Sequence, residues 1–153
     1  MKLSHTDNEG KPRMVDVSGK PVQKRTAEAT GLIRLDPETS RLIRSDGISK
    51  GNVLLTAQIS GIQAAKRTPE LIPLCHHLEL KKIDVDTEMV PEGIRVNSRV
   101  ICIGQTGAEM EALEAVSTAL LTIYDMCKAV DKNMSLEGIR LIAKKKEPIG
   151  KNS

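Results

Sequence analysis

The sequence predicts an α+β domain in which helices pack against one face of an antiparallel sheet. Two observations support this fold class. Several segments alternate apolar and polar residues, as strands do, and one long segment repeats its apolar residues every three or four positions, as a helix does. At 153 residues the chain can form one compact domain with its own core. We expect a flexible N-terminal arm over residues 1–20, a single α+β domain over 21–147 and a loose C-terminal tail over 148–153.

The first predicted elements are a strand and two helices. Residues 24–35 alternate small or apolar residues with polar ones and predict a strand. Asp36 as N-cap, followed by Pro37, predicts a short helix that ends at Asp46-Gly47. Residues 50–66 predict a second helix, although a glycine at position 61 weakens it by roughly 1 kcal/mol relative to alanine.

A turn and a hairpin follow. Thr68-Pro69-Glu70 predicts a short turn, and residues 73–77 predict irregular or extended backbone, because the residue before a proline is biased away from the helical region. Two alternating segments, residues 78–85 and 94–103, flank the turn-rich Pro91-Glu92-Gly93, which is the pattern of an antiparallel hairpin.

One long helix is predicted from Ala108 to Val130. Its apolar stripe, expected to face the core, consists of Met110, Leu113, Val116, Leu120, Ile123, Cys127 and Val130. A second stripe of carboxylates, hydroxyls and an ammonium consists of Glu111, Glu114, Thr118, Thr122, Asp125 and Lys128. A last strand over residues 138–144 completes the order strand, helix, helix, strand, strand, helix, strand, which indicates a ferredoxin-like arrangement.

Composition excludes several classes of function. No apolar run approaches the 18 residues of a membrane span, and residues 1–20 are too polar for a signal peptide, so we expect a cytoplasmic protein. Three cysteines without CxxC spacing disfavour a disulfide framework or a structural zinc site. The net charge of +3 suits an anionic small molecule. With one Tyr, no Phe and no Trp, the chain lacks the stacking platforms of RNA-binding sheets, so we expect no nucleic-acid partner.

Several carboxylates of the long helix have both a structural and a chemical interpretation. Thr106 and Glu109 fit a capping box. Asp125 and Lys128 share a helix face, as members of an ordinary surface ion pair also would. Fourteen residues separate Glu111 from Asp125, which is about 21 Å along a continuous helix. One small substrate cannot reach both, so if both serve one reaction, two subunits must build the site.

Other candidates lie outside the helix. His76 and His77 point to opposite sides of extended backbone, so only one of them can enter a given pocket. Cys75 beside His76 fits neither a thiolate-imidazole pair nor a common zinc pattern well. There is no GxxxxGK[ST] loop, so phosphates would be held by basic side chains. The basic candidates are Lys50, Lys66, Arg67, Lys128, Lys132, Lys144, Lys145 and Lys146.

Five segments together resemble the cyclic pyranopterin monophosphate synthase family, also called the molybdenum cofactor biosynthesis protein C family. They are Met14–Lys20, Ile59–Thr68, Leu71–His76, Gly107–Leu113 and Leu121–Val130. The resemblance implies a lyase that converts (8S)-3',8-cyclo-7,8-dihydroguanosine 5'-triphosphate to cyclic pyranopterin monophosphate and pyrophosphate, in molybdopterin biosynthesis. It also implies a hexamer built as a trimer of dimers, with sites at subunit interfaces, no resident cofactor, and a radical enzyme as the source of the substrate. Mg²⁺ could accompany the triphosphate.

The same resemblance implies roles for individual residues. Asp125 is expected to be the acid-base residue, with Lys128 beside it. The other catalytic residues implied are Lys50, His76, Glu109, Glu111 and Lys144. Substrate binding is expected from Leu74, Cys75, His76, Met110, Glu111, Lys66 and Arg67. The family usually has proline where this chain has His77, and we expect activity to survive with His77 outside the pocket.

Two further functions compete with this interpretation. A non-catalytic nucleotide- or phosphate-binding domain of ferredoxin-like type would show affinity without turnover. An RNA-binding module would show affinity for polynucleotide that falls steeply with salt, and the lack of aromatic residues opposes it.

Overall fold

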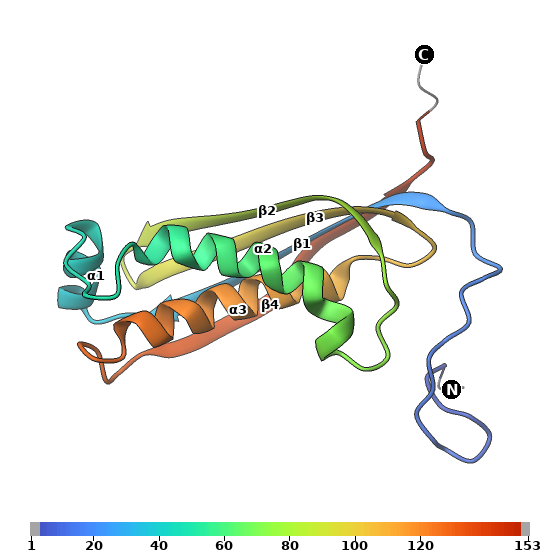
Figure 1. Cartoon of the computed structure of the whole chain (residues 1–153), viewed down its shortest axis with the longest axis horizontal. Coiled ribbons are helices and arrows are strands. Elements are labelled where there is room, and N and C mark those ends of the chain that lie inside the picture. Colours follow the sequence, from blue (N-terminus) through green and yellow to red (C-terminus); the bar gives the residue numbers. More distant parts are fainter. Residues whose placement is uncertain (1–3, 151–153) are drawn as a thin grey trace.

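The computed structural model describes residues 4–150, and within them it contains one four-stranded antiparallel sheet and three helices. The elements are β1 (Gln23–Arg34), α1 (Pro37–Arg44), α2 (Val53–Leu71), β2 (Glu79–Val90), β3 (Gly93–Gly104), α3 (Glu109–Cys127) and β4 (Ser135–Glu147). The strands are ordered β2-β3-β1-β4, and α2 and α3 lie side by side along one face of the sheet, with α1 beyond its end (Figure 1). The predicted α+β ferredoxin-like fold is confirmed.

The core lies between the sheet and the two long helices. Strand alternation turns Ala27, Ala29 and Ile33 of β1 inward, and all three side chains are buried. Gly31 belongs to the same inward set. A Cβ there would lie 2.8 Å from side-chain atoms of both Leu120 and Val116, so glycine lets α3 approach the sheet closely.

Helix α2 is longer than the sequence predicted. The expected turn at Thr68-Pro69-Glu70 is wrong, because the helix continues through Pro69 to Leu71. Proline removes only one backbone donor here, in the last turn, and Ile72 N–H still bonds to the Thr68 carbonyl at 2.9 Å. Gly61 is a packing requirement as well as a helix-weakening residue: a Cβ at this position would lie 2.9 Å from the Ala115 carbonyl oxygen of α3.

The long helix departs from its predicted pattern at the ends. Val116, Leu120, Ile123 and Cys127 are completely buried, as expected, and Leu113 is half-buried. The predicted positions of Met110 and Val130 in the core are wrong, since 37% of Met110 and 53% of Val130 is exposed. The expected capping box is also wrong. Ala108 is the N-cap, and no side chain caps the helix.

The last strand runs from Ser135 to Glu147 and extends the predicted one at both ends. Residues 4–20 form an arm outside the sheet, with an isolated bridge between Thr6 and Pro12. The predicted flexibility of the arm and of the tail stays a prediction, and residues 1–3 and 151–153 of those segments lie outside the described residues. No helix within residues 4–150 has the length and apolar character needed to cross a membrane.

Candidate functional site

Helix α3 divides the predicted site residues into two groups. Glu109, Met110 and Glu111 lie in its first turn, whereas Asp125 lies in its last turn. The helix is uninterrupted between them, so Glu111 and Asp125 are separated by about 21 Å along its axis. Within one chain, therefore, these two carboxylates belong to different sites.

The first group surrounds a cavity of about 310 Å³ at the start of α3. Six residues predicted for substrate binding or catalysis line it, namely Leu74, Cys75, His76, Glu109, Met110 and Glu111. The loop after α2 supplies the first three, and α3 supplies the others. His76 Nε2 lies 2.7 Å from the carbonyl oxygen of Val15 in the N-terminal arm. His77 is exposed, as expected for a residue outside the pocket.

Glu111 has the most perturbed acid-base behaviour in this cavity. Only 3% of the residue is exposed. Burial raises its pKa from the ordinary value of 4.5 to about 7, and the nearby Glu109 carboxylate also raises it. A carboxyl group with a pKa near 7 can both donate and accept a proton at neutral pH.

Cys75 lines the same cavity in its thiol form. Burial raises the pKa of this thiol above its ordinary value, and the neighbouring Glu111 raises it further. A nucleophilic cysteine requires the opposite shift, because the thiolate is the reactive species. The arrangement therefore disfavours covalent catalysis by Cys75.

A second cavity, of about 250 Å³, adjoins the first. Its lining includes Arg25, Glu109 and three consecutive lysines of β4, Lys144–Lys146. Gly107 and Glu109 line both cavities. Lys144 Nζ is 3.7 Å from a carboxylate oxygen of Glu109. Four basic side chains beside one carboxylate suit an anionic group such as a phosphate chain.

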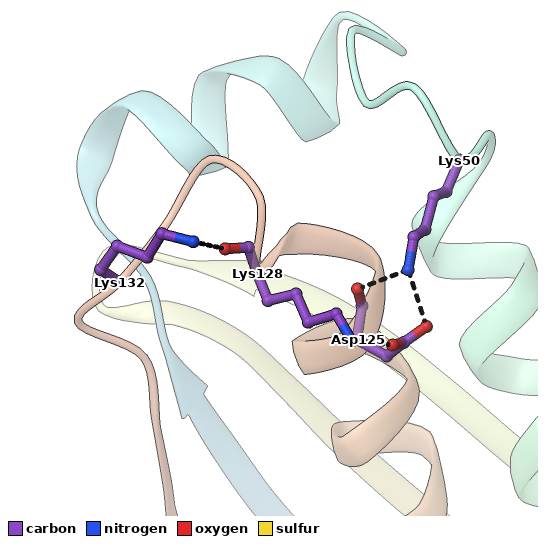
Figure 2. Close-up of polar contacts among 4 residues, drawn as sticks. All are labelled: Lys50, Asp125, Lys128 and Lys132. Atoms are coloured by element: carbon purple, nitrogen blue, oxygen red, sulfur yellow. Dashed lines mark hydrogen bonds and ion pairs between the residues drawn. The ribbon is translucent and has the colours of Figure 1, made fainter.

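The second group of predicted residues lies at the other end of α3 (Figure 2). Lys50 Nζ donates to both the backbone carbonyl and the carboxylate of Asp125, each at 3.0 Å. Lys128 Nζ lies 2.9 Å from the other carboxylate oxygen. The hydrogen bond from Lys128 lowers the pKa of Asp125 most, followed by the one from Lys50. In turn, Asp125 raises the pKa of Lys128. Proton donors and a carboxylate base thus lie in direct contact.

Two predicted binding residues lie apart from both groups. Lys66 lines a groove of about 410 Å³ between α2 and β2, together with Lys81 and Lys82 of the edge strand. Arg67 is exposed on α2. The single chain therefore does not bring Lys66 into the cavity of His76.

Sequence reasoning missed some residues that line the cavities. Arg25 is the clearest case: its guanidinium donates to the carbonyls of Gly104 and Gln105, each at 3.2 Å, and it lines the cavity of the three lysines. The sequence did contain a signal for Arg25. Residues two positions apart lie on the same face of a strand, so Arg25 shares the inward face of Ala27 and Ala29. Val15, Val17 and Lys20 also line the His76 cavity, although the arm was expected to be mobile.

No resident metal site is evident in residues 4–150, where no group of three or more His, Cys, Asp and Glu side chains could hold an ion.

Comparison with known proteins gives consistent matches. The chain is 56% identical over 146 residues to the cyclic pyranopterin monophosphate synthase of Chloroflexus aggregans, covering 94% of this chain and 88% of that protein. It is 52% identical over 145 residues to the protein of the same name from Parvibaculum lavamentivorans, with 94% and 91% coverage. It is also 55% identical over 141 residues to the molybdenum cofactor biosynthesis bifunctional protein of Chlorobaculum tepidum, covering 92% of this chain and 45% of that longer protein. Residues 14–147 match the sequence model of the MoaC family, and the chain belongs to that family.

Proposed function

We propose that the protein is a cyclic pyranopterin monophosphate synthase, a lyase of molybdenum cofactor biosynthesis. Its relatives carry that name at 52% to 56% identity over nearly their whole length. The structural observation that supports the proposal best is the pair of adjoining cavities that share Glu109. One contains the acid-base groups His76 and Glu111, and the other contains Arg25 and three lysines.

The proposed reaction makes two chemical demands on these groups. The guanine-derived ring of the cyclised dihydro-GTP must open and be rebuilt by proton transfers, for which Asp125, Lys128, His76 and Glu111 are suited. A substrate hydroxyl must then attack the α-phosphate. A phosphorus-oxygen bond forms to that hydroxyl, the bond to the β-phosphate breaks, pyrophosphate leaves, and a base takes the hydroxyl proton. Fixed cations such as Lys144 would stabilise the charge of the leaving pyrophosphate.

The proposal includes an oligomer in which two subunits complete each site. The 21 Å between Glu111 and Asp125, estimated from the helix rise, supports it. Exposed apolar side chains also support it, because Leu55, Ile59 and Leu121 of the two long helices are each more than half exposed. In addition, β4 is a 13-residue edge strand with exposed Ile142. A second copy of the chain is the occupant that we propose for these surfaces, in a hexamer built as a trimer of dimers.

Further parts of the proposal come from the family resemblance and from the composition of the chain. The enzyme would need no resident cofactor, and Mg²⁺ would arrive with the triphosphate of its substrate. It would act in the cytoplasm. Lys66 and Arg67 would reach the substrate only across a subunit boundary, since Lys66 lines a separate groove within one chain.

The test is turnover of the cyclised dihydro-GTP, measured as pyrophosphate release and as pterin product. The wild type should be compared with Asp125→Asn at matched oligomeric state, and with Asp86→Asn, which changes an exposed carboxylate of β2, as the control. We expect turnover in the wild type and the control, and its loss in Asp125→Asn. Equal turnover in all three would reject Asp125 as essential. Substrate affinity without turnover in any of them would favour the non-catalytic binding domain.

A further inference from the structure

The arm segment 14–20 lies along the His76 cavity and ends in a turn at residues 18–20. Val15 and Val17 are half-buried and line the cavity, whereas the intervening Asp16 is exposed. This alternation is typical of an extended chain with one side against a surface. Figure 1 shows the arm leaving the end of β1, separate from the sheet and the helices. Its hydrogen bonds reach His76, in the loop after α2, and Gln105, in the connection between β3 and α3.

One of these contacts is to His76. Its Nε2 atom lies 2.7 Å from the carbonyl oxygen of Val15. A carbonyl oxygen can only accept, so Nε2 must carry the hydrogen, and Nδ1 is the accepting nitrogen when the ring is neutral. The backbone of the arm thereby sets both the tautomer and the orientation of the imidazole.

The base of the same segment is held by Gln105, in the connection between β3 and α3. Its side-chain Nε2 donates to the carbonyl of Ser18 at 3.1 Å and to the carbonyl of Lys20 at 3.0 Å. Two hydrogen bonds within the segment also stabilise its conformation. Ser18 N–H donates to the Asp16 carboxylate at 2.9 Å, and Lys20 N–H donates to the Val17 carbonyl at 2.9 Å.

We propose that residues 14–20 form a strap that closes one side of the substrate cavity, and that Gln105 is a positioning residue that acts through this strap on His76. The catalytic consequence of this inference rests on the proposed function. The docking of the strap against the cavity does not depend on that function. Loss of the two amide hydrogen bonds frees the strap at its base. The Val15 carbonyl then no longer fixes the His76 ring, and a misplacement of about 1 Å can cost a large factor in rate.

The first experiment combines hydrogen exchange with steady-state kinetics. Gln105→Met removes both donors at nearly constant side-chain size and without a charge. Gln58→Met is the matched control, because Gln58 donates to Thr87 between α2 and β2, away from the cavity. In the wild type, the amides of residues 14–20 should exchange more slowly than in a free peptide of the same sequence. In Gln105→Met that protection should disappear, kcat should fall at least about tenfold and KM should change less than about threefold.

A second variant tests the strap without touching Gln105. Val17→Asp places a charge on the half-buried face of the segment and should produce the same loss of protection and of kcat. The inference is overturned if wild-type residues 14–20 exchange as fast as the free peptide, or if either variant frees the strap while kcat is unchanged. Absence of turnover in the wild type would instead count against the proposed function, and the exchange data would still decide whether the strap exists.

Discussion

Glu111 and Asp125 share no pocket within one chain, because fourteen residues of unbroken helix hold them about 21 Å apart. If the reaction uses both, each active site takes Glu111 from one chain and Asp125 from another.

This arrangement predicts complementation between two inactive variants. Glu111→Gln and Asp125→Asn are each expected to lose turnover as homo-oligomers. When equal amounts are co-assembled, a site with both native carboxylates forms at random in about a quarter of cases, so activity should recover to about a quarter of the wild-type value. Native mass spectrometry would verify that mixed oligomers form. Mixed oligomers without any recovery would mean that the two carboxylates act from the same chain, and turnover in a homo-oligomer of either variant would mean that its carboxylate is dispensable.

The buried Glu111 predicts a pH-dependent stability penalty. Its pKa is raised from 4.5 to about 7, mainly by burial, so the folded state binds this proton more tightly than the unfolded state. The penalty of the buried charge is absent below pH 4.5, grows between pH 4.5 and 7, and is complete above 7. At full size it is at most about 3 kcal/mol. Glu111→Gln should therefore gain stability relative to the wild type as pH rises from 5 to 8. Denaturant unfolding at both pH values measures this difference, and an unchanged difference would contradict the shifted pKa.

The buried Asp131 predicts a pH dependence of folding stability that is opposite in sign to that of Glu111. Only 2% of this residue is exposed, and its carboxylate accepts the N–H groups of Asp36 and Asn133, each at 2.9 Å. Burial raises its pKa, but these bonds, together with one from Thr39, outweigh burial and lower the net value. The stabilisation is present above the unfolded pKa near 3.8 and is lost as pH falls through the lower folded pKa.

Asp131→Asn should accordingly destabilise the fold at pH 7, by about 1–3 kcal/mol, because it places an amide donor against N–H groups. The difference from the wild type should shrink in strong acid, where the native carboxyl is protonated too. Urea unfolding at pH 7 and at a series of pH values below 3.8 follows this difference. Asp86→Asn, at an exposed position on β2, should stay within about 0.5 kcal/mol of the wild type. An Asp131→Asn protein as stable as this control at pH 7 would show that the bonds of Asp131 contribute nothing net.

The elements predicted best from the sequence were those with a strong local pattern. The alternation of β1 and the turn at Pro91-Glu92 specified their strands, because strand period and turn chemistry depend on neighbouring residues alone. The separation of Glu111 from Asp125 was equally predictable, since it follows from the rise of a helix.

The sequence predicted poorly what depends on tertiary packing. Nothing local shows that Glu111 is buried while Met110, one position earlier, is partly exposed. Pro69 was read as a helix breaker because a local rule cannot tell a mid-helix proline from one in the last turn. Likewise, the contact between Val15 of the arm and His76 joins residues that are 61 positions apart, and no periodic pattern in the sequence predicts such a contact.

For the substitution Gly61→Ala, helix propensity and tertiary packing predict opposite effects on stability. Helix propensity alone predicts that Gly61→Ala would stabilise α2 by roughly 1 kcal/mol. The structure predicts destabilisation, because the new methyl group would lie 2.9 Å from the Ala115 carbonyl oxygen and 3.1 Å from Val85 Cγ1. Backbone on one side and a buried valine on the other leave little room for relaxation, so we expect a net loss of about 1–3 kcal/mol. Thermal and urea unfolding of Gly61→Ala would be compared with Gln63→Ala, an exposed change on the same helix that should be neutral or slightly stabilising. A gain in stability for Gly61→Ala would show that α2 and α3 are less closely packed than the structure indicates.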